Sequence, residues 1–373
     1  PLTLPFGIAP VVSEYVTFLN GGEAMKYGAP YWNIKDILPY QRNFNFINGE
    51  RSIGKTYTAE GYFIERALNN GEEFVYICRT QEEKKGGILE KSFAKVLACE
   101  FPNQPIKSTT EVMELIIEDE NGDVIEKKTL GYCLALSEAV KIKKRSFPFV
   151  RWLMFDEYML EEKQRASYVN GWKEPDLLLS IYHTIDRERD YVICFMFGNN
   201  TSFYNPYHMH SAFNIPYIEK GGIWYNENVL FQWAESTEEL KDKKSKCKFL
   251  KMIDKTDYGQ YAKHGDYVDD NINFIGDRTG NSRHLFTFEY EKEIYGVWQD
   301  MKLGLVFIDS KYDKSCTLNY ALTIDDHKEN TMFTRSKSDT LLMWLGKMFK
   351  LGNVRYTSMR VKVKAEQAIK LIL

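Results

Sequence analysis

Residues 44–56 read Phe-Asn-Phe-Ile-Asn-Gly-Glu-Arg-Ser-Ile-Gly-Lys-Thr, an apolar run followed by a complete G-x-x-x-x-G-K-[ST] motif. The order of strand, glycine-rich loop and helix is the context in which this motif indicates a nucleotide phosphate site. Successive backbone N–H groups of such a loop surround phosphate oxygens, and the following helix adds its positive N-terminal end. We expect the nucleotide to be held by Gly49, Glu50, Arg51, Ser52, Ile53, Gly54, Lys55 and Thr56.

Two side chains of this loop have specific expected roles. Lys55 would reach the β- and γ-phosphates of ATP, and the Thr56 hydroxyl would be a ligand of Mg²⁺. The glycines are required because a Cβ would block the close approach of the backbone to phosphate. The alternative is a glycine turn that caps a helix and leaves Lys55 in solvent, and the apolar strand in front of the loop argues against it.

The composition is that of an ordinary globular protein, with 44% hydrophobic and 27% charged residues among 373. The length favours two domains. The six cysteines are scattered singly without a C-x-x-C pair, which indicates a reducing compartment rather than a zinc or disulfide framework. No signal peptide or transmembrane stretch is expected. The net charge of −3 implies that any contact with a polyanion is local.

Strands and helices alternate through the first half, which predicts a mostly parallel sheet. The predicted strands span residues 44–48, 74–78, 149–155 and 191–197, and the predicted helices span 55–68, 88–98 and 177–185. An Asn121-Gly122 turn predicts a β-hairpin between them. The predicted fold of this half is an α/β P-loop NTPase.

The pattern changes after residue 200. Residues 199–222 are rich in Asn, Pro, Tyr and Gly, and a capping box at 236–239 opens a lysine-rich helix. Strands dominate from about residue 271, and residues 331–373 carry nine Lys or Arg against two Asp or Glu. We therefore predict an ATPase domain over residues 1–200, a linker with a lysine-rich helix over 201–255, and a C-terminal α+β domain over 256–373.

The predicted strand at residues 149–155 ends in Asp156-Glu157. In P-loop ATPases an aspartate at this place holds Mg²⁺ beside the loop hydroxyl, so Asp156 is the expected partner of Thr56. Glu157 can orient and polarise the attacking water as a general base. This acid separates water-activating ATPases from nucleotide kinases, which do not need it.

Four further residues are candidates whose alternatives stay open. Asn199, at the end of the 191–197 strand, could contact the γ-phosphate or the attacking water, with Asn200 as the alternative. Arg187 and Arg189, just before that strand, could reach the γ-phosphate of a neighbouring subunit or lie in a solvated loop. Residues 81–87 suggest a mobile loop on which Lys84 and Lys85 could grip a DNA backbone by charge, the alternative being a solvated loop.

Together these features resemble the DNA-packaging ATPases of small protein-primed podophages, within the terminase-like, additional-strand P-loop ATPase group. The resemblance rests on the arginine within the phosphate loop, the Phe155-Asp156-Glu157 strand tip, the Gly198-Asn199 strand end and the arginine segment at 186–190. It covers about the first 200 residues. In that family the arginine segment carries a finger that acts on the neighbouring subunit.

The resemblance implies a homomeric ring, expected to be a pentamer, at the portal vertex of a procapsid in the host cytoplasm. The ring would drive double-stranded DNA inward with ATP and Mg²⁺, and the need for a packaging RNA as scaffold stays open. It also implies that the C-terminal domain is a vestigial RNase H-like nuclease. Its acids (Glu289, Asp309, Asp325 and Asp326) form no obvious two-metal cluster, so we expect it to bind nucleic acid through its basic tail.

Two other functions remain open from sequence. The chain could be another ring translocase or helicase of the same ATPase group. It could also be a small-molecule kinase in which Arg187 and Arg189 form a phosphate lid, although Glu157 argues against this.

Overall fold

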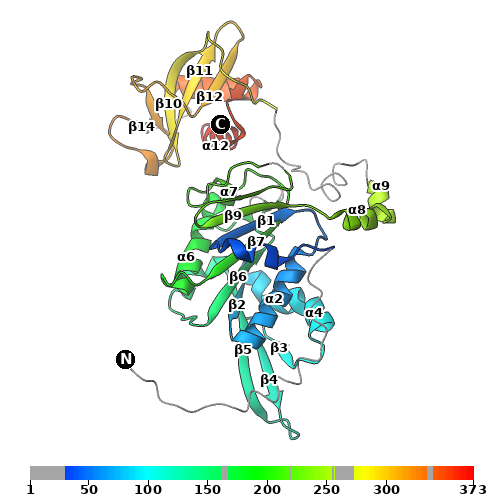
Figure 1. Ribbon diagram of the computed structural model, residues 1–373. Coiled ribbons are helices and arrows are strands. Elements are labelled where there is room, and N and C mark those ends of the chain that lie inside the picture. Colours follow the sequence, from blue (N-terminus) through cyan, green and yellow to red (C-terminus); the bar gives the residue numbers. More distant parts are fainter. Residues whose placement is uncertain are drawn as a thin grey trace. The chain divides into compact units, whose positions relative to one another are not determined.

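The computed structural model describes residues 30–160, 164, 167–218, 220–253, 256, 273–333 and 339–373. They divide into two compact units (Figure 1). The first contains the described residues up to Asn200 and those from Ile218 to residue 256, and the second contains Thr201–Tyr217 and the described residues from 273 onward. Residues 1–29 and 257–272, which the sequence assigns to the two predicted domains, lie outside the described residues.

The first unit is built on one sheet, in which the described residues supply nine strands in the order β3-β4-β5-β2-β6-β7-β1-β9-β8. The strands are β1 (Phe44–Gly49), β2 (Glu73–Cys78), β3 (Ile106–Ser108), β4 (Val112–Glu118), β5 (Val124–Ala135), β6 (Val150–Asp156), β7 (Ile193–Asn199), β8 (Ile223–Tyr225) and β9 (Val229–Ala234). The six central strands, from β5 to β9 in this order, are parallel. The predicted α/β fold with a mostly parallel sheet is therefore confirmed.

The prediction of a linker over residues 201–255 is wrong for residues 223–234, because they contain two strands of the first sheet, β8 and β9. β9 pairs in parallel with β1 along its whole length, from Phe44 opposite Val229 to Gly49 opposite Ala234. The apolar run Val229–Ala234 is itself a local signal of a buried strand, but it follows an irregular, Asn- and Pro-rich stretch and does not reveal which strand it pairs with. β7 pairs with one side of β1, and β9 pairs with the other side.

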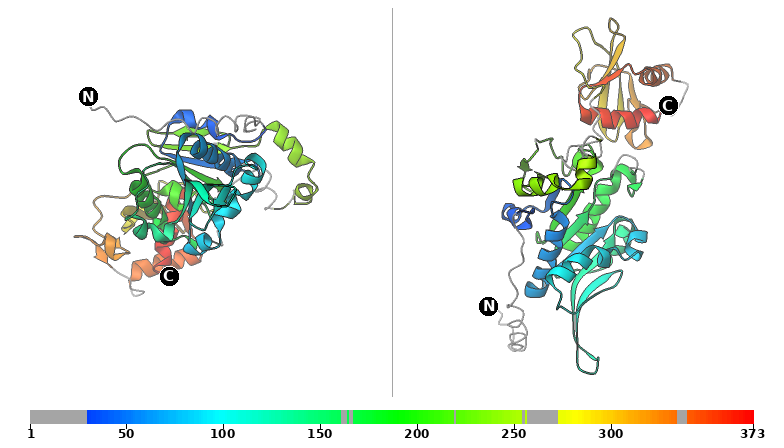
Figure 2. Two further views of the ribbon diagram at one scale, coloured as in Figure 1. Left: turned by 90° about the horizontal axis from the view of Figure 1, so that it is seen from below. Right: turned by 90° about the vertical axis from the view of Figure 1, so that its right-hand side faces the viewer.

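Helices cover both faces of the sheet (Figures 1 and 2). The helices of this unit are α2 (Lys55–Asn70), α3 (Gln81–Lys85), α4 (Ile88–Glu100), α5 (Ala139–Ile142), α6 (Glu174–Asp186), α8 (Glu238–Ser245) and α9 (Lys248–Ile253), and the last two project to one side of the sheet. α2 and α4 lie on one face, where Phe63 and Phe93 pack on alternate strand residues such as Phe74 and Phe195. α6 lies on the other face. Because the central strands are covered on both sides, their side chains are almost all apolar.

The second unit combines a sheet with helices α7 (Pro206–Met209), α11 (Thr340–Lys350) and α12 (Met359–Lys370). Its described strands are β10 (Arg283–Tyr290), β11 (Glu293–Asp300), β12 (Leu305–Asp309), β13 (Asn319–Ala321), β14 (Met332–Phe333) and β15 (Val354–Tyr356), in the order β14-β13-β10-β11-β12-β15. β10, β11 and β12 form an antiparallel meander, and β13 returns parallel to β10. This order fits the α+β, RNase H-like arrangement that the resemblance implies.

The structure confirms one predicted feature of this half and changes another. The hairpin of β4 and β5 forms as expected, with Asn121 and Gly122 in its turn. Residues 81–85, expected as a mobile loop, instead form α3, because Thr80 and Glu83 make a capping box. Within the described part of the chain, no helix is both long and apolar enough to cross a membrane.

Candidate functional site: the carboxyl edge of the parallel sheet

The phosphate loop connects the end of β1 to the start of α2, as the motif requires. Ser52 and Gly54 have φ angles of 63° and 89°, so the loop curls through the left-handed region before the helix begins. The buried Lys55 side chain folds back over the loop, and its Nζ donates to the carbonyl oxygens of Gly49 (3.1 Å) and Glu50 (2.9 Å). The loop therefore has the shape of a phosphate cradle with its lysine held at the rim.

Gly49 is required for a reason that the sequence does not reveal. A Cβ at this position would lie 2.4 Å from the carbonyl oxygen of Ala234 on β9. The first glycine of the motif thus allows β9 to lie directly against the end of β1. Gly54 is required by its positive φ, and a Cβ there would also come within 3.1 Å of Tyr31.

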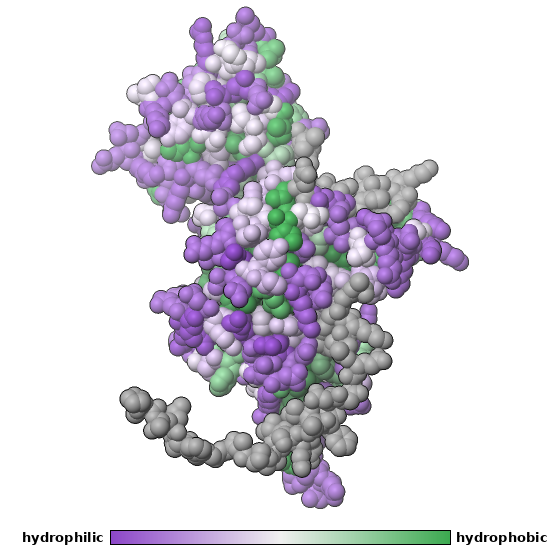
Figure 3. All heavy atoms as spheres, in the orientation of Figure 1, coloured by the Kyte–Doolittle hydropathy of each residue, from purple (hydrophilic) through white to green (hydrophobic). Residues whose placement is uncertain are grey.

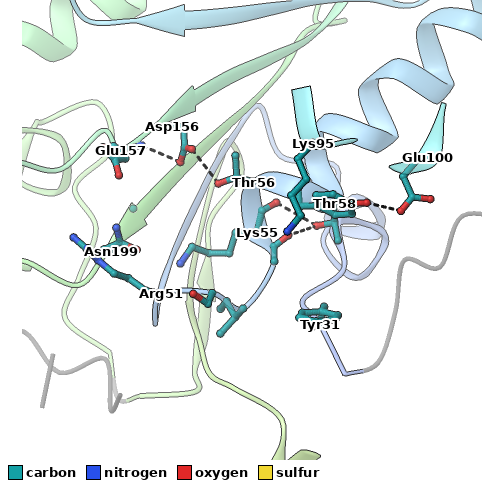
Figure 4. A pocket seen from close by; sticks show the side chains of 15 residues that line it. Tyr31, Arg51, Lys55, Thr56, Thr58, Lys95, Glu100, Asp156, Glu157 and Asn199 are labelled. Carbon is teal, nitrogen blue, oxygen red and sulfur yellow. Dashed lines mark hydrogen bonds between the residues drawn. The ribbon is translucent and has the colours of Figure 1, made fainter. Parts of the chain in front are cut away.

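Thr56 and Asp156 meet across the gap between α2 and β6, as expected (Figure 4). The Thr56 hydroxyl donates to Asp156 Oδ2 at 3.0 Å. Burial raises the pKa of Asp156 to about 6, although the hydrogen bond from Thr56 opposes this. Burial also lowers the pKa of Lys55 to about 8, against the attraction of Asp156. Two oxygen donors side by side are the kind of ligand that Mg²⁺ takes from a protein.

A cavity of about 730 Å³ opens beside this pair. It is lined by Tyr31, Arg51, Ser52, Ile53, Gly54, Lys55, Thr56, Tyr57, Thr58, Lys95, Glu100, Asp156, Glu157, Gly198 and Asn199. The predicted Glu157 and Asn199 are thus brought to the same cavity as the loop. The sequence did not identify Tyr31, Lys95 or Glu100, because they come from segments without a recognisable motif.

Glu157 stands at the carboxyl end of β6 with its side chain exposed. Its φ is 51°, a conformation that costs a non-glycine residue free energy and persists only when its surroundings enforce it. Its N–H donates to Asp156 Oδ1 at 3.0 Å. The next residue, Tyr158, is fully buried, and its hydroxyl donates to Asn48 Oδ1 at 2.6 Å. The turn after β6 is thereby fastened to the residue before the phosphate loop.

Arg79 also binds the turn after β6, through the backbone carbonyls of that turn. The sequence did not identify this residue. It follows β2, its side chain is 7% exposed, and it donates to the carbonyl oxygen of Tyr158 at 2.9 Å and, more weakly, to that of Glu157 at 3.4 Å. Its Nε also pairs with the fully buried carboxylate of Glu174 at 3.1 Å, at the start of α6. Its guanidinium lies over the Phe155 ring. No local motif announces this role, because its partners lie about 80 and 95 residues away.

Arg187 and Arg189 lie far from this cavity within the same unit. They follow α6 and precede β7, and they bond to the segment before β6, so they stand at the amino edge of the sheet. Arg187 donates to the carbonyls of Arg145 and Thr184. Arg189 donates to four carbonyls, those of Phe147, Pro148, Ile185 and Asp186. Both residues are exposed. Neither is placed to act on its own subunit's cavity.

The expectation that Lys84 binds DNA is wrong. Its side chain is only 8% exposed, and its Nζ forms ion pairs with Glu111 (2.8 Å) and Glu138 (2.7 Å). Its charge is therefore already neutralised within the first unit. Lys85, the next residue on α3, is exposed and stays a candidate.

Glu50 contributes its backbone, and not its carboxylate, to the cradle. The carboxylate is buried and turned toward Ser236 and Lys244. Of Glu50, only the backbone is therefore available to the phosphate cradle.

Three of the four acids that the sequence singles out in the second unit are engaged separately. Asp309 pairs with Arg278 at 2.7 Å and accepts from Thr357 at 3.0 Å. Glu289 pairs with Lys328, and Asp326 accepts the N–H groups of residues 291 and 292. Among the residues that the structure describes, no group of three or more His, Cys, Asp or Glu could hold a metal ion. Asp325 is exposed on the surface.

The order of strands defines the class of protein. β7 lies between β1, which leads into the phosphate loop, and β6, which ends in Asp156-Glu157. A strand interposed between these two is the mark of the additional-strand P-loop NTPases.

Comparison with known proteins gives the family. A family model described as podovirus DNA encapsidation protein (Gp16) matches residues 27–371. The DNA packaging protein of Bacillus phage phi29 is 30% identical over 336 residues, which cover 89% of this chain and 95% of the relative. That of Bacillus phage B103 is 30% identical over 322 residues, covering 86% and 94%. The chain belongs to the podovirus DNA encapsidation family.

Two solved structures extend the likeness to three dimensions. The structure of the bacteriophage phi29 viral genome packaging motor assembly contains a chain with a TM-score of 0.72 and 28% identity, covering 92% of this chain and 100% of that one. The phi28 gp11 DNA packaging motor gives a TM-score of 0.60 at 19% identity, with 92% and 98% covered, and shows the shared fold. This chain is therefore a viral DNA-packaging protein, and it shares the fold of these packaging-motor chains over 92% of its length.

Proposed function

We propose that this chain hydrolyses ATP and uses the energy to drive double-stranded DNA into a procapsid. The observation that carries the proposal is the contact of Thr56 with Asp156 at 3.0 Å, in a cavity that also holds Lys55 and Glu157. This arrangement provides a cradle for phosphates, a place for a divalent cation and an acid next to it. A site that only docked nucleotide would not need Glu157.

Each side chain has a defined part in the reaction. Lys55 would leave the loop carbonyls and neutralise the β- and γ-phosphates. Glu157 would accept a hydrogen bond from the attacking water and align it with the γ-phosphorus. Asn199, at the tip of the neighbouring β7, would hold the same water or a γ-phosphate oxygen. Arg51, which lines the cavity, would add positive charge beside the phosphates.

The donor set suits Mg²⁺. Thr56 and Asp156 offer a hydroxyl and a carboxylate oxygen, and Mg²⁺ is usually held by one or two such groups together with water and substrate phosphates. When bound, the ion would neutralise charge on the phosphate oxygens. It would also keep Asp156 ionised, against the effect of burial on its pKa.

The likeness to the phi29 motor assembly supports a set of partners. We infer a homomeric ring, expected to be a pentamer, that acts on double-stranded DNA at the portal of a procapsid in the host cytoplasm, with the need for a packaging RNA left open. An exposed Lys85 would contact the DNA backbone by charge alone. The second unit would bind nucleic acid without cutting it, since no group of three or more of its described acids could hold a metal ion.

The kinase alternative has little support from the geometry. A phosphate lid made of Arg187 and Arg189 would have to close over the cavity of its own subunit. Both lie at the amino edge of the sheet, whereas the cavity lies at the carboxyl edge. A neighbouring subunit in a ring could present them there, which favours the motor.

A steady-state assay tests the proposal. Phosphate release from ATP should rise several-fold when linear double-stranded DNA or procapsids are added, and the DNA effect should fall as salt is raised. Phosphate transfer to a small molecule, measured in parallel, should be absent. An ATP turnover that neither DNA nor procapsids change in assembled rings would contradict the motor function.

The Arg79 network gives a further prediction. Arg79→Lys keeps the positive charge but loses the several N–H donors of the guanidinium that bind the backbone carbonyls of Glu157 and Tyr158. Glu157 should then be displaced, and kcat should fall about 10²-fold. Nucleotide affinity should stay near that of the unchanged protein, since Arg79 does not line the cavity among the described residues. In a Glu157→Gln background the same substitution should cost nothing more. A further loss there would mean that Arg79 acts by another route.

A further inference from the structure

Glu50 is an anomaly in a loop that binds a polyanion. Its carboxylate is buried, with the residue only 3% exposed, and the residue belongs to the phosphate loop itself. Such a charge would oppose phosphate binding unless it were neutralised. The structure neutralises it from a distant part of the sequence.

The neutralising group is Lys244, on the second turn of α8. Its Nζ lies 2.6 Å from Glu50 Oε2 and 2.8 Å from the Ser236 hydroxyl, and its side chain is 11% exposed. Ser236 also donates to the same carboxylate through its hydroxyl and, at 3.4 Å, through its N–H. Burial opposes the ionisation of Glu50, but the bonds from Lys244 and Ser236 outweigh it and lower the pKa below its ordinary value. The Glu50 carboxylate is therefore ionised although it is buried.

Lys244 differs from the other lysines around it. Lys241, Lys243, Lys246 and Lys248 are exposed, and this part of the surface is strongly hydrophilic (Figure 3). A helix that served only to present charge would leave all its lysines in solvent. Lys244 instead turns inward to the phosphate loop, and the ion pair fixes α8 to that loop.

Two groups of Glu50 accept hydrogen bonds, its backbone carbonyl and its carboxylate, and we expect nucleotide to affect only the first. Its carbonyl oxygen accepts from Lys55 at 2.9 Å, and its carboxylate accepts from Lys244. A phosphate oxygen is a stronger acceptor for an ammonium group than a neutral carbonyl is. Nucleotide would therefore draw Lys55 away from the Glu50 carbonyl while the carboxylate stays bound to α8.

We propose that Lys244 is a positioning residue for the phosphate loop, and that the Glu50–Lys244 pair transmits nucleotide occupancy to helix α8. The position of α8 in the sequence indicates what such coupling could serve. It comes directly after β9, the last parallel strand beside β1, and precedes in sequence the bulk of the second unit. A movement of the phosphate loop would thus be passed to α8, which lies near the end of the first unit in the sequence. The inference rests on nucleotide binding at the phosphate loop, as proposed above.

Hydrogen exchange of the full chain provides the test, with Mg²⁺ and a slowly hydrolysed ATP analogue as the probe. The amides of residues 236–246 should change their exchange rates several-fold on nucleotide binding. Glu50→Gln and Lys244→Met should lose that response, whereas Lys244→Arg should keep it. Lys246→Met, at an exposed position just after the same helix, is the matched control and should behave as the unchanged protein.

Nucleotide affinity gives a second, independent readout. Lys244→Met should weaken binding at least about tenfold, because it leaves Glu50 charged and unpaired near the phosphates. In a Glu50→Gln background Lys244→Met should add little, since the charge that it neutralises is gone. A pair that only stabilises the fold would lower the melting temperature without this pattern.

The outcomes separate this inference from the proposed function. If the unchanged protein binds the analogue and α8 does not respond, or responds equally in Glu50→Gln, the coupling is overturned and nucleotide binding stands. If the unchanged protein does not bind the analogue, the proposed function itself fails.

Discussion

Glu157→Gln is expected to bind ATP with near-normal affinity and to hydrolyse it about 10³-fold or more slowly. The amide keeps the size and position of the side chain at the tip of β6, but it cannot accept a proton from the attacking water. General base catalysis is typically worth 10²–10⁴-fold. Among the described residues that line the cavity, the other acids are Asp156, which is bonded to Thr56, and Glu100, which accepts from the Tyr57 hydroxyl, so both are already engaged. Binding of a fluorescent nucleotide and single-turnover hydrolysis measure the two quantities separately.

Lys55→Ala is the matched comparison. It should lose nucleotide affinity, because a counter-charge for the β- and γ-phosphates disappears. The two variants therefore separate binding from chemistry at one site. A Glu157→Gln protein that hydrolyses ATP at nearly the original rate would remove Glu157 as the catalytic residue.

Arg187→Ala is expected to leave nucleotide binding by the isolated subunit intact and to stop turnover in assembled rings. An arginine finger supplied by a neighbouring subunit stabilises charge that develops in the transition state, and its loss typically costs 10³–10⁵-fold in kcat. Arg187 is the better candidate because its guanidinium is tied to two carbonyls, whereas that of Arg189 holds four. We expect Arg189→Ala to lower the melting temperature instead.

Mixed rings test whether the finger acts between subunits. Arg187→Ala and Glu157→Gln subunits, each inactive alone, are combined in one ring. Activity should return where a Glu157→Gln subunit lends its intact arginine to a neighbour that has an intact Glu157. An arginine that acted on its own cavity could not be rescued in this way. Verified mixed rings without any recovery, for Arg187 and for Arg189, would overturn the assignment.

Much of the site could be predicted because it consists of contiguous motifs at strand ends. The phosphate loop, Asp156-Glu157 and Asn199 each follow a run of apolar residues, and the carboxyl ends of parallel strands meet at one edge of a sheet. The predictions that are wrong concern residues whose surroundings come from distant parts of the sequence. Lys84 was expected on the surface, but its burial depends on Glu111 and Glu138, which lie 27 and 54 residues further along the chain. No pattern around Lys84 carries that information.

The sequence by itself determined the class of site and the fold of the first half, because nearest-neighbour chemistry suffices for a glycine-rich turn, a buried strand and a helix start. Only the tertiary structure decided which strands are neighbours. It placed β9 against β1, so that Gly49 makes room for Ala234, and it brought Arg79 to the Glu157 turn and Lys244 to Glu50. These contacts join residues 79 to 194 positions apart. Such pairings are selected by burial and charge compensation in the assembled core, which no short stretch of sequence contains.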